Sequence, residues 1–273
     1  MSENRIVAGF ARLASKGRAG VLPYITAGYP SLDATARLIR AFADSGAAAV
    51  EIGFPFSDSI ADGPVIQESF HRVLETRQRV EQIWETIGQV RAEIDLPLVA
   101  MVSCSLVERQ GLDAFTRHCA SAGFDGLIVP DVPLEEAPRV SAAAEGAGLC
   151  HIMLVADSTP ADRARRIVEL CSGFVYQIAV SGTTGERSTL QTDLAANVER
   201  LRSLTSLPIS VGFGIATPQH VRQVGRLADG VIVGSAVVRR ITEAIDAGQP
   251  VEAIVEAVGG FVGELVAASQ PTG

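Results

Sequence analysis

Three acidic residues stand close together in a segment suited to acid–base chemistry. Glu51 lies inside the apolar run A-V-E-I at 49–52, and Asp58 and Asp62 follow it. Burying a carboxylate in an apolar strand costs several kcal/mol unless it is paired or has a task. Apolar surroundings also raise its pKa toward the range of a general acid or base. One buried carboxylate and one loop carboxylate can differ enough in pKa for Glu51 and Asp62 to act as acid and base. The alternatives are a structural salt bridge at Glu51 and an ordinary Asp-Gly turn at Asp62.

Glycine-rich turns follow the last three predicted strands. They read S-G-T-T-G-E at 181–186, V-G-F-G-I-A-T-P at 211–218 and V-G-S-A-V at 233–237. In α/β barrels, the loops after the seventh and eighth strands commonly bind phosphate with a helix N-terminus, and glycine lets backbone N–H groups approach the anion. One such turn is weak evidence, but three in succession predict a phosphate site. Its residues are Gly185, Gly214, Gly234 and Ser235.

These residues require a scaffold that gathers strand ends on one face. Eight apolar runs supply the strands, and they are predicted at 21–28, 47–53, 97–102, 126–131, 151–156, 174–180, 208–214 and 230–235. The runs are apolar almost throughout, as strands covered on both faces are. Helical patterns separate them, which indicates βαβ units and a parallel sheet.

Capping signals mark several helix boundaries. Thr-Pro pairs begin at Thr159 and Thr217, and each places a capping hydroxyl before a proline at the first helical position. Glycines are expected where helices end, at Gly46, Gly123 and Gly148.

Eight units of strand and helix predict a (β/α)8 TIM barrel of the α/β class. An extra N-terminal helix is expected before Val21 and an extra C-terminal helix from Val251. An open doubly wound sheet is the alternative, but the turn after the first strand lacks the G-x-G-x-x-G pattern. No linker-like tract divides the chain, so residues 1–273 are predicted to form a single domain.

Composition narrows the functional classes. Hydrophobic residues make up 47% of the 273 residues and the formal net charge is −8, with no basic stripe, so nucleic acid and anionic membranes are not expected as partners. No apolar run reaches the roughly 18 residues of a membrane helix, and no signal peptide is evident. The four cysteines form no C-x-x-C pair, which predicts reduced thiols in a cytoplasmic protein.

Two further kinds of chemistry are not expected. The four histidines have no metal-like spacing, so no metal site is predicted, and His118 and His220 are expected to be surface residues or hydrogen-bonded structural residues. None of the predicted strands contains a lysine, which removes the usual nucleophile of a Schiff-base aldolase.

The segment E-I-G-F-P-F-S-D-S-I-A-D-G-P-V-I-Q, from Glu51 to Gln67, closely resembles the signature of tryptophan synthase alpha subunits. The resemblance continues in order through P-Y-I-T-A-G at 23–28, L-I-V-P-D-V-P-L-E-E at 127–136, T-G at 184–185, G-F-G-I at 212–215 and G-S-A-V-V at 234–238. It implies a TIM-barrel lyase of tryptophan biosynthesis. The implied reaction is retro-aldol cleavage of indole-3-glycerol phosphate to indole and glyceraldehyde 3-phosphate.

The resemblance also implies roles for individual residues. Glu51 would move a proton between the substrate hydroxyl and indole C3, and Asp62 would accept the indole N–H hydrogen bond. Tyr24 and Tyr176 would lie beside the indole and the acid. The implied phosphate and substrate contacts are Thr184, Gly185, Phe213, Gly214, Gly234 and Ser235.

The family works with a beta subunit that carries pyridoxal phosphate, as an α2β2 complex in which indole passes through a tunnel. The resemblance therefore implies no cofactor on this chain, and it implies that the loop 55–62 and the loop after the sixth strand contact the partner. Several residues depart from the family pattern, namely Tyr29, Ser59, Ser103, Ser105, Ala179 and Val180. They border the indole pocket and these loops, so they bear on coupling to beta more than on catalysis.

Three other functions remain as alternatives. A free-standing indole-3-glycerol phosphate lyase would perform the same chemistry without stimulation by beta. A barrel isomerase would use the same phosphate site on sugar phosphates, but it does not explain the Asp62 segment. A non-catalytic activator of beta would leave Glu51 without a task.

Overall fold

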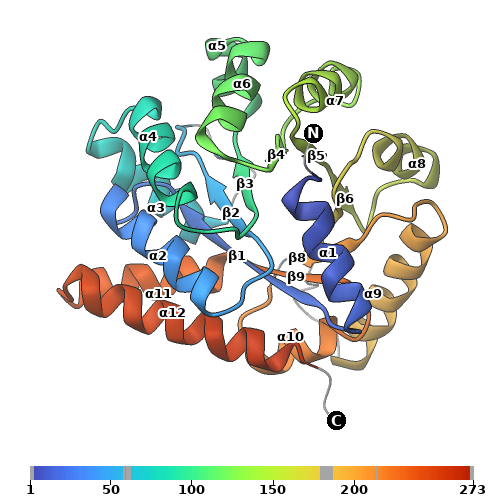
Figure 1. Ribbon diagram of the computed structural model, residues 1–273. Helices are drawn as coiled ribbons and strands as arrows, with labels where there is room; N and C mark the ends of the chain where they lie inside the picture. The colour runs from blue at the N-terminus through green and yellow to red at the C-terminus, as the bar shows by residue number, and fades with distance from the viewer. Residues whose placement is uncertain (1–2, 58, 60–62, 179–186, 213, 271–273) are drawn as a thin grey trace.

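The computed structural model describes residues 3–57, 59, 63–178, 187–212 and 214–270. Among them, parallel strands form one sheet in the order β5-β4-β3-β2-β1-β9-β8-β7-β6, and helices surround it (Figure 1). The strands are β1 Gly20–Thr26, β2 Val50–Gly53, β3 Leu98–Met101, β4 Gly126–Ile128, β5 Cys150–Ile152, β6 Leu154–Ala156, β7 Val175–Ile178, β8 Ile209–Gly212 and β9 Gly230–Val233.

The sheet closes into a barrel through a strand that is interrupted once. β5 pairs with β4 and β6 pairs with β7, and only Met153 separates β5 from β6. The Met153 carbonyl accepts a hydrogen bond from the backbone N–H of Tyr176 at 3.1 Å, so the interruption does not open the barrel. β5 and β6 together form the predicted fifth strand, and the predicted eight-stranded barrel is confirmed.

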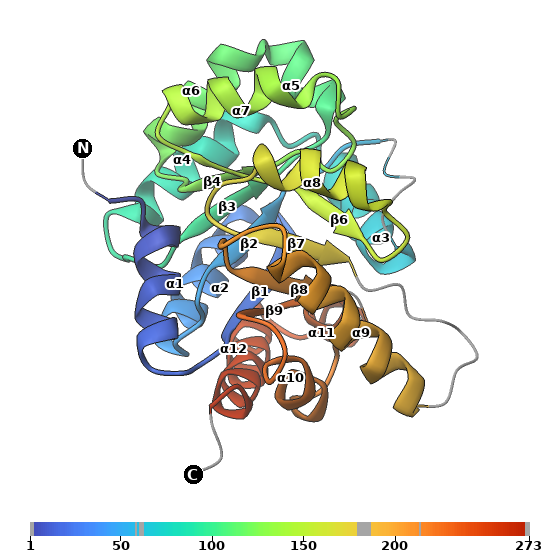
Figure 2. The ribbon, with the colours of Figure 1, turned by 90° about the vertical axis from the view of Figure 1, so that its right-hand side faces the viewer.

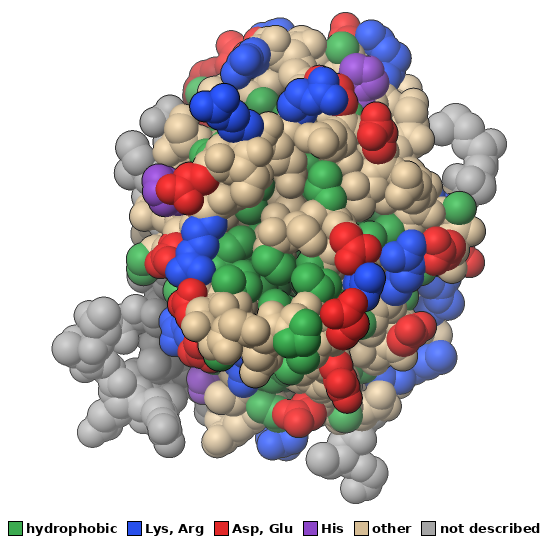
Figure 3. Space-filling view, turned by 90° about the vertical axis from the view of Figure 1, so that its left-hand side faces the viewer, with side chains coloured by type: hydrophobic (Ala, Val, Ile, Leu, Met, Phe, Trp, Pro, Cys, Tyr) green, Lys and Arg blue, Asp and Glu red, His purple; other side chains and the backbone are tan. Residues whose placement is uncertain are grey.

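The helices are α1 Arg5–Ser15, α2 Leu32–Asp44, α3 Pro64–Glu75, α4 Val80–Arg91, α5 Cys104–Gln110, α6 Leu112–Ala122, α7 Ala137–Gly146, α8 Ala161–Glu169, α9 Arg187–Arg202, α10 Pro218–Val224, α11 Ser235–Asp246 and α12 Val251–Ala268. Two of the connections between strands contain two helices each: α3 and α4 lie between β2 and β3, and α5 and α6 lie between β3 and β4. The predicted extra helices are α1 and α12. Figure 3 shows the outer surface on the side where Figure 1 places α2, α3 and α11. Hydrophobic side chains gather in the middle of this face, and acidic and basic side chains surround them.

One predicted helix cap is confirmed and another is wrong. The Thr217 hydroxyl accepts a hydrogen bond from the backbone N–H of His220 and caps α10. The Thr159 hydroxyl instead accepts from the backbone N–H of Ala156, and Pro160 is the N-cap residue of α8. The Thr159 side chain thus closes the turn after β6, which leaves no acceptor for the helix.

Successive residues of a strand point to opposite faces of the sheet, so every second residue of each strand points into the barrel interior. α1 closes one end of this core, and in Figure 2 it lies on the side of the barrel away from α3. Phe10 of α1 packs on Phe174 with ring centroids 5.4 Å apart. The buried members of the interior cluster are Ile6, Phe10, Leu22, Ala49, Val99, Ile128, Cys150, Ile152, Phe174 and Ile232.

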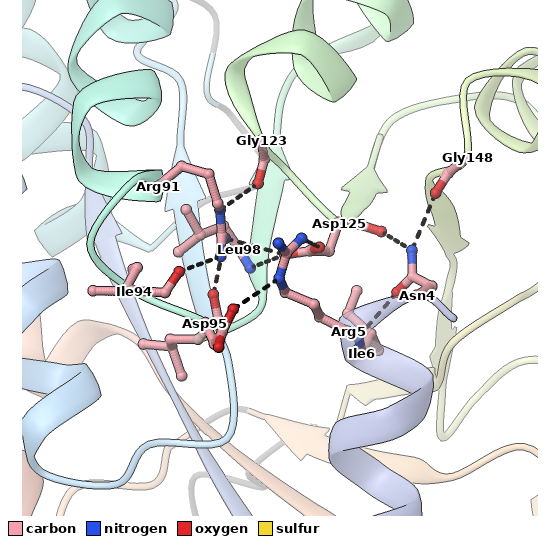
Figure 4. Close-up of polar contacts among 11 residues, drawn as sticks. Asn4, Arg5, Ile6, Arg91, Ile94, Asp95, Leu98, Gly123, Asp125 and Gly148 are labelled. Atoms are coloured by element: carbon pink, nitrogen blue, oxygen red, sulfur yellow. Dashed lines mark hydrogen bonds and ion pairs between the residues drawn. The ribbon is translucent and has the colours of Figure 1, made fainter. Parts of the chain in front are cut away.

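A buried carboxylate ties α1 and α4 to the beginnings of two strands (Figure 4). Asp125, only 4% exposed, accepts hydrogen bonds from Arg5 at 3.0 Å, from Arg91 at 3.2 Å and from the backbone N–H of Leu98 at 2.9 Å. Arg91 also donates to three backbone carbonyls, including that of Gly123 at 2.9 Å. Because this network lies at the strand N-termini, we assign it to stability.

The second half of the barrel repeats this arrangement. Asp229 precedes β9 as Asp125 precedes β4, and its carboxylate accepts from the backbone N–H of Ile209 at 2.9 Å. Arg202, the last residue of the preceding α9, pairs with Asp229 at 3.1 Å, as Arg91 of α4 pairs with Asp125. The repeated device links β3 with β4 and β8 with β9 at their N-termini, and we assign it to stability as well.

Candidate active site

The predicted acid, Glu51, is enclosed within the barrel. Its side chain is 1% exposed, and neither carboxylate oxygen has a hydrogen-bond partner among the described residues. Burial disfavours the charged form and raises the pKa of Glu51 from 4.5 to about 8. Within the described part of the chain no basic side chain pairs with Glu51, so the structural salt bridge finds no support.

The barrel geometry explains why Glu51 is desolvated. Ala49 belongs to the interior cluster, and Glu51 lies two positions later on the same face of β2, one layer nearer the strand C-termini. The register partner of Glu51 on β3 is Val99, a member of that cluster, and Met101 of β3 and Tyr176 of β7 pack against the same cluster. The carboxyl group consequently faces apolar and aromatic side chains, and at neutral pH it holds its proton.

Tyr24 connects the acid to the predicted phosphate end of the site. It is paired with Glu51 in the register of β1 and β2, and its side chain is 4% exposed. A Cβ built on Gly53 would lie 1.9 Å from the Tyr24 hydroxyl oxygen, so the tyrosine ring occupies the space left by that glycine. On its other side, a Cβ on Gly234 would lie 3.7 Å from the Tyr24 Cβ. Tyr24 therefore lies between the end of β2 and the end of β9.

Tyr176 makes an equivalent contact across the barrel. A Cβ built on Gly212, the last residue of β8, would lie 2.5 Å from the Tyr176 hydroxyl oxygen. Sequence reasoning did not predict roles for Gly53 and Gly212. Glycine at the end of an otherwise bulky strand is the signal, because it often marks a close approach of another group.

The two described phosphate turns lie side by side. Gly212 of β8 pairs with Ile232 of β9, and Gly214 and Gly234 each follow two residues later at the same edge. Gly214 has a φ of 71°, a left-handed conformation that favours glycine. α11 begins at Ser235, and its N-cap residue, Gly234, follows β9 and has no side chain to cap the helix. The N–H groups at the start of a helix and the helix dipole suit an anion.

Several predicted site residues lie outside the described residues. These are Asp58, Asp62, Ala179, Val180, Thr184, Gly185 and Phe213. The described residues bring Glu51, Tyr24 and Gly234 together through the β2-β1-β9 order, and they place Tyr176 beside Gly212.

Other titratable groups are separate from this site. Among the described residues no group of three or more His, Cys, Asp or Glu side chains is arranged to hold a metal ion. His118 and His220 are exposed, as predicted, and the four cysteines are free. Buried His151 lies on β5, and its pKa is lowered by burial to about 4. No helix in the described part of the chain is long and apolar enough to cross a membrane.

An enclosed acid at the end of a barrel strand, beside a glycine-lined helix N-terminus, defines a TIM-barrel enzyme that acts on a small phosphorylated substrate. Comparison with known proteins identifies the family. Residues 10–267 match the tryptophan synthase alpha chain family. The alpha chain of Chloroflexus aggregans is 41% identical over 268 residues and covers 98% of both chains. That of Rhodopirellula baltica is 40% identical and covers 94% of this chain and 95% of its own.

Solved structures agree with the sequence comparison. The tryptophan synthase alpha subunit of Legionella pneumophila str. Paris superposes with a TM-score of 0.90 and 33% identity, covering 98% of each chain. A Mycobacterium tuberculosis tryptophan synthase chain gives 0.87 and 32%, covering 99% of this chain and 100% of its own. The chain therefore belongs to the tryptophan synthase alpha chain family, and it is a lyase of tryptophan biosynthesis that cleaves indole-3-glycerol phosphate.

Proposed function

We propose that Glu51 is the general acid and base of this cleavage and that Asp62 stabilises the charge on the indole ring. The observation that carries the proposal is an enclosed carboxyl group whose pKa is raised by burial to about 8, next to Tyr24 at the strand ends. A carboxyl group that holds a proton at neutral pH is suited to donate it to a carbon atom.

The proposed reaction needs only one proton carrier. Glu51 donates its proton to indole C3, which places positive charge on the ring, and the Asp62 carboxylate accepts the hydrogen bond from the ring N–H. The resulting Glu51 carboxylate then removes the proton from the side-chain hydroxyl on the carbon attached to C3. The electrons of that O–H bond form the aldehyde C=O, and the C–C bond electrons return to the ring. Indole and glyceraldehyde 3-phosphate leave, and Glu51 has regained its proton.

The substrate phosphate is assigned to the backbone N–H groups at Gly214, Gly234 and Ser235, together with the loop that contains Thr184 and Gly185. β1 alone separates β2 from β9, and neighbouring strands lie about 4.8 Å apart, so the acid and this anion site are about 10 Å apart across the sheet. The phosphate would thus anchor the end of the substrate opposite to the bond that breaks.

The partner, the cofactor and the cellular compartment are assigned from family membership. The partner is a tryptophan synthase beta subunit in an α2β2 complex, the pyridoxal phosphate belongs to that subunit, and this chain requires no cofactor of its own. The enzyme is placed in the cytoplasm. The departures from the family pattern at Ser103 and Ser105 lie at the start of α5, where the two hydroxyl oxygens are 3.1 Å apart and the Ser103 hydroxyl caps the helix by accepting from the backbone N–H of Leu106.

The test is indole release from indole-3-glycerol phosphate by the purified chain, with and without an added beta subunit. Glu51→Gln is expected to lower kcat by about 10²–10⁴-fold while the substrate still binds, because proton transfer is lost and the phosphate contacts remain. Near-normal cleavage by Glu51→Gln would refute the assigned role. Rates unchanged by beta would instead favour a free-standing lyase.

A further inference from the structure

The two methionines in the described part of the chain differ in exposure. Met153, between β5 and β6, is 8% exposed and therefore buried. Met101 is the last residue of β3, and it is only partly buried, whereas the three strand residues before it are fully buried. Met101 is therefore the methionine that a small molecule in solution can reach.

Met101 lies near the proposed acid, toward the open end of the barrel. It packs against the interior cluster, as a residue two positions after Val99 should, because alternate residues of a strand share one face. Its register partner on β2 is Gly53, which stands two residues after Glu51. With about 3.3 Å per residue and about 4.8 Å between strands, the Cα atoms of Met101 and Glu51 are about 8 Å apart. The thioether thus shares the inner face of the sheet with the Glu51 carboxyl group and lies nearer the strand C-termini.

The cysteines are poor competitors for an oxidant. The thiolate is the reactive form of cysteine, and burial disfavours it. Desolvation raises the pKa of Cys150 to about 11 and that of Cys171 to about 12. It also raises the pKa of Cys104 and Cys119. All four therefore remain thiols at neutral pH, whereas a thioether has no proton to lose before it reacts.

We propose that Met101 is a modification site at which hydrogen peroxide lowers the lyase activity reversibly. The thioether sulfur attacks one peroxide oxygen, the O–O bond breaks, and the other oxygen leaves with both protons as water. The sulfur has then given two electrons to the peroxide and carries one oxygen atom as a sulfoxide. Methionine sulfoxide reductases restore the thioether with electrons from thiols.

The inference rests on the proposed role of Glu51, because the sulfoxide would act on the surroundings of that residue. Oxidation converts a flexible apolar side chain into a polar one. Neither carboxylate oxygen of Glu51 has a hydrogen-bond partner among the described residues, so the protonated group is free to donate to the sulfoxide oxygen. An apolar indole ring bound beside the sulfoxide would also desolvate it, which should lower kcat/KM by about 10–10²-fold.

Peroxide treatment of the parent, of Met101→Leu and of the matched control Met153→Leu tests the inference. Leucine has a similar volume and no oxidisable sulfur, and each activity is expressed relative to the untreated sample of the same protein. The parent and Met153→Leu are expected to lose about 10–10²-fold in kcat/KM for indole-3-glycerol phosphate. Peptide mass spectrometry should find the sulfoxide at Met101 in both, and treated Met101→Leu should retain most of its activity.

The reductant that restores activity identifies the oxidised sulfur. Dithiothreitol reduces sulfenic acids and disulfides of cysteine, whereas the two epimers of methionine sulfoxide need reductases of both stereospecificities. The treated parent is therefore expected to recover with these reductases and not with dithiothreitol alone. Should Met101→Leu fail to fold, the mass spectra and this recovery still decide the question in the parent.

Four results would overturn the inference. They are equal inactivation of the parent and Met101→Leu, full activity of a parent that carries the sulfoxide at Met101, inactivation without that sulfoxide, and recovery in dithiothreitol alone. The proposed role of Glu51 fails separately, if Glu51→Gln releases indole at the parental rate before any peroxide is added.

Discussion

Replacing Glu51 with glutamine should stabilise the protein in a strongly pH-dependent manner. The pKa of Glu51 is raised by burial from 4.5 to about 8 in the folded protein. Between these values the folded state holds a proton that the unfolded state has released, so unfolding becomes easier as the pH rises. The favourable contribution is fully present below about pH 4.5 and is lost progressively up to about pH 8.

The size of the effect follows from the same values. Each pH unit between the folded and unfolded pKa corresponds to about 1.4 kcal/mol. A rise of about 3.5 therefore gives a difference of about 5 kcal/mol between acidic and alkaline pH. Since glutamine does not ionise, the free energy of unfolding of Glu51→Gln should exceed that of the parent by about 5 kcal/mol above pH 8, by about 3 kcal/mol at pH 7 and by little near pH 4.5.

Urea unfolding of both proteins at pH values from 5 to 9 measures this difference directly. Glu264→Gln provides the control, because Glu264 is an exposed residue of α12 and its substitution should leave the pH dependence unchanged. Parallel curves for the parent and Glu51→Gln would refute the reasoning, since they would mean that Glu51 ionises in the folded protein as it does in the unfolded chain.

Four further outcomes are expected. The kcat/KM for indole-3-glycerol phosphate should fall above about pH 8, because the proposed mechanism begins from protonated Glu51; a rise through that pH would contradict this order of proton transfers. Gly214→Val should raise KM more than it lowers kcat, since valine resists the φ of 71° and obstructs the anion site; an unchanged KM would remove Gly214 from that site. Asp125→Ala should lower the free energy of unfolding by about 3–5 kcal/mol and leave kcat at 20 °C within about twofold, because it leaves Arg91 buried without its charge partner at the end of the barrel opposite the site. Burial lowers the pKa of His151 from 6.5 to about 4, so between these pH values the unfolded state binds a proton that the folded state does not. The free energy of unfolding should therefore fall by about 3 kcal/mol as the pH falls through this range. In urea unfolding, His151→Leu should show a smaller loss over the same range.

The sequence by itself determined the class of fold and the candidate acid. Eight apolar runs separated by helical patterns specified a parallel sheet covered on both faces, because a strand in any other setting would alternate apolar and polar residues. Glu51 was recognisable because an ionisable residue inside such a run has to be desolvated. The glycine turns near Gly214 and Gly234 pointed to an anion site for another local reason, which is that glycine lets the backbone N–H groups approach a ligand.

Only the tertiary structure decided which residues meet. The contact of Tyr24 with Gly53 depends on the register of β1 and β2, and the position of Gln67 over the Ser59 carbonyl depends on how α3 packs against β1. The interruption of the fifth strand at Met153 and the use of the Thr159 hydroxyl to close a turn were likewise absent from the local pattern. Periodicity records which face of an element is buried, whereas register and helix packing are set by side chains far apart in the sequence.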